Sequence, residues 1–392
     1  MSPDPRDFSV VLGGPLFQLL RRARLTDDAL LLLRKRIVVI SLFAWMPLLV
    51  LSVLEGHFLS GSTPVPFLRD IEVHVRFLVA MPLLVGAELL VHARMRPLVR
   101  QFLERRVVPE AAIPRFDAAI ASAVRLRNSV VAEALIIALV YGAGVVLWRH
   151  NVALDTATWY ATPSSTGGLR PSLAGWWYGY VSLPAFQFLL LRWYLRVFIW
   201  ARFLWQVSRI RLDLAPTHPD GAGGLGFLAI LGSAFVPLAL AHGVQLAGQI
   251  ADRIFFVNAA LPDFKAEVAV MVVFMLVLAL GPLLPFAGQL AEAKRTGLRE
   301  YGALAQRYVR EFDEKWLRGG ATDDEPLVGS GDIQSLADLG TGYERVQAMK
   351  LAPITKGMVI QIVVATVAPV IPLTLTMMPL EQLLKTLLRV LV

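Results

Sequence analysis

Long uninterrupted apolar blocks alternate with charged segments along the chain. Seven blocks come close to the ~20 residues with which a helix crosses the ~30 Å hydrocarbon core of a bilayer. They cover roughly residues 37–55, 76–94, 128–148, 176–200, 226–249, 266–289 and 357–379. A membrane barrel would instead show alternating segments of about 10 residues. The pattern predicts an all-α, polytopic membrane protein with about seven transmembrane helices.

Positive charge is distributed unevenly between the apolar blocks. Of the 38 Lys and Arg residues, 30 belong to the N-terminal arm and to the segments that follow the second, fourth and sixth blocks, and 8 belong to the alternate segments, when the arginines near the block ends (Arg76, Arg94, Arg192 and Arg196) are counted with the adjoining segment. Since Lys and Arg mark the cytoplasmic side, we expect a cytoplasmic N-terminus and a periplasmic C-terminus, in a bacterial inner membrane. The net charge of +8 then faces the anionic lipids of the cytoplasmic face, and no nucleic-acid partner is expected.

Two arginines intrude at the end of the fourth block. Arg192 and Arg196 lie among Trp193, Tyr194 and Trp200. Aromatic belts with neighbouring arginines are typical of membrane interfaces, so both guanidiniums are expected to snorkel to the headgroups.

Helical spacing continues into several charged segments. The predicted organisation is an N-terminal interfacial amphipathic helix in 1–36, spans one to six with helical connections in 37–290, a cytoplasmic helical segment in 291–356, and the final span with a short periplasmic tail in 357–392. Helices outside the spans are expected at 14–36, 109–128, 291–317 and 333–350. The Gly-rich, acidic stretch 318–331 predicts a flexible linker. Asp332 is expected to cap the helix that follows, and Pro353 to end it.

Ionisable residues inside predicted spans are candidates for function. Glu88 and His92 lie four residues apart and share a helix face, and helical rise places Glu133 at a similar depth in the next span. If these two spans pack together, the three residues form one polar cluster. It could relay protons, bind a cation or lock two helices together. A structural alternative pairs the two carboxylates with nearby arginines such as Arg94 or Arg127.

Polar residues also follow the fifth and seventh blocks. His242, Gln245 and Gln249 share one face, which indicates either an aqueous vestibule or hydrogen bonds between helices. In the last span, Gln361, Thr366, Pro369 and Thr374 are candidates to line a pore, because threonines and prolines among apolar residues suit a kinked, pore-lining helix. Threonines and prolines suit a packed helix equally well, because the hydroxyls can bond to the carbonyls that the prolines leave free.

The stretch THPDGAGGLGFL (217–228) joins a charged segment to the fifth block. His218, Asp220, Gly223 and Gly224 have the chemistry of a tight turn. A divalent cation held by His218, Asp220 and Asp213, or an anion at the helix N-terminus that follows, is a less favoured alternative. The chain has no cysteine and no catalytic or nucleotide-binding motif. We therefore expect no enzyme activity, cofactor or metal.

Four stretches, GGPLFQLLRRARLTDDALLLLRKR, THPDGAGGLGFL, DIQSLADLG and MMPLEQLLKTLLRVL, resemble a group of proteobacterial multi-pass membrane proteins, and this resemblance covers most of the chain. In architecture alone, seven spans with long extensions of the fourth and sixth are similar to the insect odorant and gustatory receptor channels. Members of that superfamily are tetrameric cation channels. The resemblance implies an anchor between subunits at 333–350 and a pore around 357–379, although that family's Thr-Tyr…Gln-Phe type signature is missing and no ligand site carries over.

The leading hypothesis from the sequence is a homo-oligomeric ion channel or channel-like transport protein whose last span lines the path. One alternative is a proton- or cation-coupled transporter that uses Glu88, His92 and Glu133. Another is a membrane scaffold or sensor that does not transport.

Overall fold

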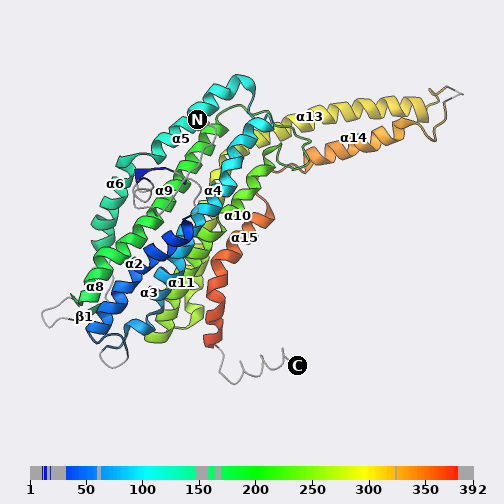
Figure 1. Cartoon of the computed structure of the whole chain (residues 1–392). Coiled ribbons are helices and arrows are strands. Elements are labelled where there is room, and N and C mark those ends of the chain that lie inside the picture. Colours follow the sequence, from blue (N-terminus) through cyan, green and yellow to red (C-terminus); the bar gives the residue numbers. More distant parts are fainter. Residues whose placement is uncertain are drawn as a thin grey trace.

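The computed structural model describes residues 11, 13–15, 18, 32–59, 63–146, 158–163, 169–322 and 325–377. Within them the chain is all-helical apart from one two-stranded antiparallel sheet, β1 (Ala161–Pro163) and β2 (Leu169–Pro171). Two helices, α13 (Ala287–Phe312) and α14 (Gly331–Gln347), project together from one end of the bundle (Figure 1). We call this end the hairpin end. Most of the predicted helix 14–36 and all residues after 377 lie outside the described residues.

The other elements, in chain order, have the following bounds. In the first half of the chain they are α2 (Leu33–Leu54), η1 (Phe67–Arg69), α3 (Ile71–Val75), η2 (Arg76–Ala80), α4 (Met81–Glu104), η3 (Glu110–Ala112), α5 (Ile113–Arg127), α6 (Val130–Leu139), η4 (Val140–Gly144), α8 (Leu173–Trp177), η5 (Tyr178–Ser182) and α9 (Leu183–Ser208). In the second half they are η6 (Leu225–Ala229), α10 (Ile230–Ala234), α11 (Val236–Val257), η7 (Leu261–Phe264), α12 (Lys265–Leu280), η8 (Gly281–Phe286), η9 (Asp313–Leu317), α15 (Lys356–Val367) and η10 (Ala368–Met377).

Long apolar helices dominate the bundle. Among the described residues, five helical stretches are long and apolar enough to cross a membrane, and they cover Leu33–Leu54, Ile71–Glu104, Leu225–Val257, Leu261–Leu317 and Lys356–Met377. A shorter apolar helix covers Val130–Gly144. On the surface of α12, Val270, Val273 and Val277 are each more than half exposed. Apolar side chains that face outward need lipid rather than water around them. The fold is that of a membrane-embedded helical protein, which confirms the predicted class.

Two wide helical turns have a visible cause in the sequence. η2 and η5 are π-helical turns, and each lies just before a proline, Pro82 or Pro184. A proline has no N–H for the carbonyl four residues earlier, so the helix must re-route its hydrogen bonds. For Pro184 that carbonyl belongs to Tyr180, and it accepts a hydrogen bond from the Tyr141 hydroxyl at 3.2 Å. The proline therefore ties η5 to η4.

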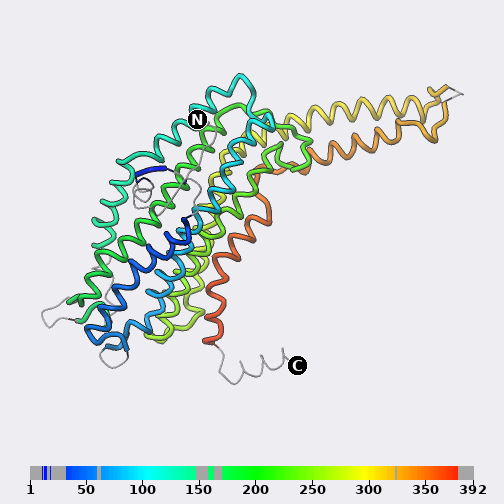
Figure 2. The backbone as a smooth tube through the Cα atoms, in the orientation of Figure 1, coloured from blue at the N-terminus to red at the C-terminus, as the bar shows by residue number. Residues whose placement is uncertain are grey.

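The last span packs tightly against α11. Figure 2 shows the chain running from the hairpin end into α15, which contacts α10, α11 and α12. At the closest approach an added Cβ on Gly243 would lie 2.2 Å from the Thr366 carbonyl oxygen, so glycine is required there. Pro369 and Pro372 remove two helical donors, and the helix continues as the 3-10 segment η10.

The prediction that Asp332 caps the helix after the linker is wrong. Ser330 occupies the N-cap position of α14, and Asp332 lies in the first turn. Its carboxylate accepts hydrogen bonds from Lys315 Nζ and Trp316 Nε1, both at 2.9 Å. Asp332 thus joins α14 to the end of the preceding helix, because a cation and an indole donor compete successfully for the carboxylate.

Candidate functional site

A buried ionic cluster joins four helices in the membrane-embedded bundle. Glu88 of α4 is 5% exposed, and its two carboxylate oxygens are reached from different helices. Arg196 of α9 donates to Oε1 at 2.6 Å. Arg36 at the start of α2 donates to Oε2 and, at 3.4 Å, to the Val85 carbonyl. Because an unpaired charge in such a place is very costly, these contacts are what allow Glu88 to be buried.

A third guanidinium connects Glu88 to the second predicted carboxylate. Arg192 lies one turn before Arg196 on α9, 3.3 Å from Glu133 Oε1 and 3.7 Å from Glu88 Oε1. Glu133 lies in the first turn of α6. The structure therefore brings Glu88 and Glu133 to one guanidinium, at the similar depth that helical rise predicted. His92 is half-buried one turn further along α4.

One prediction about this cluster is wrong, and another is confirmed except for the arginines that it named. Arg192 and Arg196 do not snorkel to the headgroups, since each is 5% exposed and faces Glu88. The structural alternative, in which the buried carboxylates pair with arginines, is confirmed, but the ion-pair partners of Glu88 are Arg36, Arg192 and Arg196 rather than the suggested Arg94 or Arg127. An arginine near the end of an apolar helix has the same sequence signature whether it snorkels to the headgroups or pairs with a buried carboxylate. Only the packing of α9 against α4 distinguishes them.

The cluster is arranged to hold helices together. Protonating Glu88 would leave three guanidiniums buried beside a neutral group, which the low-dielectric interior opposes. The geometry thus favours a fixed ionic lock between α2, α4, α6 and α9.

The predicted vestibule residues divide between two networks. Gln245 and Gln249 both donate to Glu72 Oε1 of α3, at 3.0 and 3.1 Å. His242 is buried and lies 2.8 Å from the Tyr194 hydroxyl of α9 through Nε2. Of the three side chains only Gln249 is exposed. The contacts are interhelical hydrogen bonds, which is the structural alternative for this face.

A second polar network, made of residues that the sequence pattern did not single out, lies at the end of the bundle opposite the hairpin. Arg76 pairs with Glu72 and donates to the Tyr178 hydroxyl. Asp252 of α11 accepts the backbone N–H groups of Ile71 and Glu72 at 3.0 and 3.1 Å, so it satisfies the first two N–H groups of α3 from another helix. The spacing of Glu72 and Arg76, four residues apart on a helix, was the available signal.

Asp70 lies next to this network and is itself buried. It accepts hydrogen bonds from Trp159 Nε1 at 2.7 Å and from the Val73 N–H at 2.9 Å. Burial raises the pKa of the Asp70 carboxyl, and these two hydrogen bonds only partly oppose that effect. The indole contact also fixes the residues around β1 against η1.

The glycine-rich joint is organised by one carboxylate. Asp220 accepts the backbone N–H groups of Ala222, Gly224 and Gly226 at 2.7, 3.2 and 2.7 Å. Gly223 and Gly224 have positive φ angles of 64° and 99°, which glycine adopts without strain. His218 Nδ1 lies 3.0 Å from Asp220. With its oxygens committed to the loop, Asp220 acts as a turn-former, and among the described residues no group of three or more His, Asp or Glu could hold a metal ion.

The joint also contacts the segment that leads into the last span. The Lys350 N–H donates to the Gly221 carbonyl at 2.8 Å. Lys294 of α13 donates to the Met349 carbonyl at 2.9 Å. Three segments distant in the sequence therefore meet where α15 begins.

The four predicted pore residues do not share one face. Thr366 is 1% exposed, lies against α11 and donates its hydroxyl to the Ile362 carbonyl at 2.8 Å. Pro369 is half-buried, whereas Gln361 and Thr374 are exposed. Thr366 thus belongs to the packed interior of the chain, and the outward positions are Gln361 and Thr374.

No family model, curated protein or solved structure matches this chain. The fold and the contacts above define a membrane-embedded helical protein, and the resemblances noted from the sequence stay predictions.

Proposed function

We propose that the chain is a homo-oligomeric, channel-like protein of the bacterial inner membrane, with seven spans and a cytoplasmic N-terminus. The count of seven adds the short apolar helix α6–η4 and the arginine-bearing α8–α9 to the five long apolar helices. In this arrangement the hairpin end is cytoplasmic, and the last span faces a path between subunits.

The exposed amide of Gln361 carries the proposal. It lies on the outer surface of α15, a helix apolar enough to cross a membrane. None of the hydrogen bonds among the described residues uses this side chain. Moving an amide from water to hydrocarbon without a partner costs about 4–8 kcal/mol. A neighbouring subunit or a water-filled path is therefore a better environment for this face of α15 than lipid.

The hairpin supports association of several copies. Leu304 and Val309 of α13 and Ile333 of α14 are 41%, 42% and 48% exposed, although the hairpin projects from the bundle (Figure 1). Apolar side chains in such a position are covered when a second hairpin packs against them. Only residues 348–355 separate α14 from α15, so hairpins that associate would also bring the last spans toward a common axis.

The test uses the absence of cysteine from the chain. Gln361→Cys and Thr374→Cys place single thiols on the outward face of the last span, and Thr366→Cys is the matched control on its buried face. Ion flux from liposomes is measured before and after a charged, membrane-impermeant thiol reagent. We expect the reagent to reduce flux through the variants at 361 and 374 and to leave the variant at 366 unchanged.

Two results would contradict the proposal. One is the absence of flux for several cations and anions from protein that is monomeric in lipid. The other is an oligomer that survives Leu304→Glu together with Val309→Glu, which would remove the role given to the hairpin. Persistent oligomers without flux would favour a scaffold. Flux through a monomer that requires Glu88 and Glu133 would favour the coupled transporter.

A further inference from the structure

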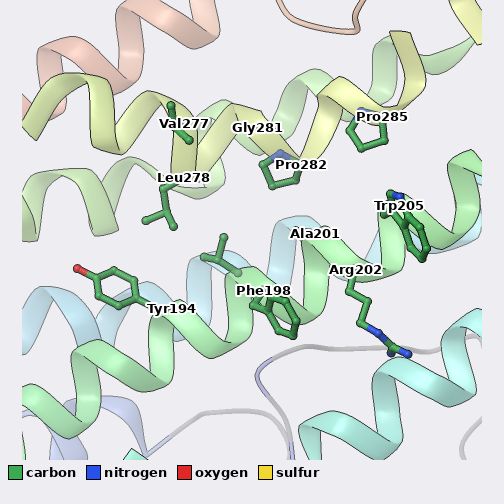
Figure 3. A pocket seen from close by; sticks show the side chains of 11 residues that line it. Tyr194, Phe198, Ala201, Arg202, Trp205, Val277, Leu278, Gly281, Pro282 and Pro285 are labelled. Atoms are coloured by element: carbon green, nitrogen blue, oxygen red, sulfur yellow. The ribbon is translucent and has the colours of Figure 1, made fainter. Parts of the chain in front are cut away.

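An elongated groove of about 670 Å³ lies between α9 and the α12–η8 helix. Figure 3 shows the two helices side by side, with Tyr194 and Val277 toward one end of the groove and Arg202, Trp205 and Pro285 toward the other. Both helices run toward the hairpin end, so Arg202 marks the end of the groove nearest to the hairpin.

A break in the sixth apolar helix creates the groove. Gly281 has no side chain, and Pro282 and Pro285 convert the helix into the narrower 3-10 segment η8. Pro282 also has no N–H to donate to the Leu278 carbonyl, four residues earlier. The result is a hollow opposite the large side chains of α9, rather than the close packing expected between two regular helices.

The chemistry of the walls is asymmetric. Apart from the Tyr194 hydroxyl at the far end, which lies 2.8 Å from His242 Nε2, the lining is apolar except at the hairpin end, where Arg202 is half-buried. Its guanidinium has five N–H donors, and within the described part of the chain it makes one hydrogen bond, to Ser122 Oγ at 2.7 Å. No acidic residue lines the groove. Trp205, beside Arg202, is 51% exposed, in the position that an aromatic residue takes at a membrane interface.

The length of the groove matches one leaflet. Tyr194 and Trp205 are eleven residues apart on one helix, which corresponds to about 16 Å at the α-helical rise. This is about half of a ~30 Å hydrocarbon core. A chain that fills the groove from Arg202 inward would therefore end near the middle of the bilayer.

We propose that the groove binds one acyl chain of an anionic phospholipid, whose phosphate is held by Arg202. The apolar walls fit a hydrocarbon chain of one leaflet, and the single cation at the mouth, without a carboxylate beside it, fits a phosphate. A zwitterionic lipid fits the walls equally well, but its own cation offsets the attraction at the mouth. The proposal requires only that α9 and α12 lie in the membrane and is independent of ion conduction.

Native mass spectrometry of the purified full chain tests the site by titration with phosphatidylglycerol and, separately, phosphatidylcholine. Arg202→Gln removes the cation. Gly281→Leu fills the groove, and the backbone accepts it because the nearest atom to an added Cβ is 3.9 Å away. Arg211→Gln and Gly288→Leu are matched controls, since Arg211 is exposed beyond the end of α9 and Gly288 has no neighbour within 4 Å.

We expect one phosphatidylglycerol per chain to be retained in preference to phosphatidylcholine. Arg202→Gln should weaken phosphatidylglycerol binding about tenfold, the effect of one charge-assisted hydrogen bond, and leave phosphatidylcholine unchanged. Gly281→Leu should weaken both lipids, and neither control should change. If Gly281→Leu does not fold, Val277→Trp fills the same groove from a position that is 64% exposed. Equal phosphatidylglycerol binding by the wild type and Arg202→Gln, or by the wild type and the groove-filling variant, would overturn the proposal.

Discussion

Replacing Glu88 by Gln tests whether the ionic cluster is a lock. Gln keeps the size of the side chain but removes the charge that Arg36, Arg192 and Arg196 share. Removing one partner of a buried ion pair typically costs about 3–5 kcal/mol, because the remaining charge stays buried. Glu88→Gln is expected to lower the free energy of unfolding by an amount in this range.

Two further variants provide comparisons for this loss of unfolding free energy, one in the same cluster and one on the surface. Glu133 is buried and lies 3.3 Å from Arg192, so Glu133→Gln should also lower the free energy of unfolding, because it removes negative charge beside a buried guanidinium. Glu267 pairs with Arg253 at 3.1 Å, but the two side chains are 48% and 55% exposed. Glu267→Gln should therefore cost less than about 1 kcal/mol.

The measurement is equilibrium unfolding in mixed micelles, followed by circular dichroism as the fraction of sodium dodecyl sulfate rises. Glu88→Gln is combined with Arg196→Met in a double-mutant cycle, which isolates the 2.6 Å contact. A loss for Glu88→Gln no larger than that for Glu267→Gln would refute the lock, and so would strict additivity in the cycle.

Two more predictions concern the joint and the last span. Burial raises the pKa of Asp220, but the hydrogen bonds from Ala222, Gly226 and Gly224 outweigh it and leave the pKa below its ordinary value. The stabilisation is therefore present above the unfolded pKa of about 3.9 and is lost as the pH falls through the folded pKa. The thermal midpoint of the wild type should fall more steeply below about pH 4 than that of Asp220→Asn, and parallel curves would contradict the assignment. Gly243→Ala places a Cβ 2.2 Å from the Thr366 oxygen and should destabilise the fold by about 1–3 kcal/mol. Gly142→Ala, which meets nothing within 4 Å, is its control in the same unfolding assay.

Apolar blocks predict the helices of this protein well and their ends poorly. The block at 76–94 belongs to a helical stretch that covers Ile71–Glu104, and the block at 226–249 to one that covers Leu225–Val257. An apolar block corresponds to the part of a helix that lies in the hydrocarbon core. Charged residues with good helix propensity extend the same helix beyond the core, so the block ends before the helix does. The wide turns before Pro82 and Pro184 were accessible in principle, because proline removes an identifiable donor.

Pairing between helices was the part that the sequence could not determine. Helical rise placed Glu88 and Glu133 at one depth, but the identity of their partners depends on α2 and α9 packing beside α4. In the same way, His242 and Gln245 share one face of α11 in projection, yet they meet Tyr194 and Glu72 on different neighbours. One helix face is broad enough to contact two neighbouring helices, and the periodicity of the sequence does not show which residue of that face contacts which neighbour.

A polar side chain in a membrane helix indicates that it needs a partner without identifying that partner. For Glu88, Glu133, His242 and Gln245 the chain supplies the partner itself, so their conspicuous positions are explained by the fold. Gln361 is different, because it faces outward from α15 and takes part in none of the hydrogen bonds among the described residues. The residues satisfied within one copy account for the stability of the bundle. Gln361 has an exposed amide without such a partner among the described residues, and this is why the thiol accessibility of position 361 is the more direct test of the proposed function.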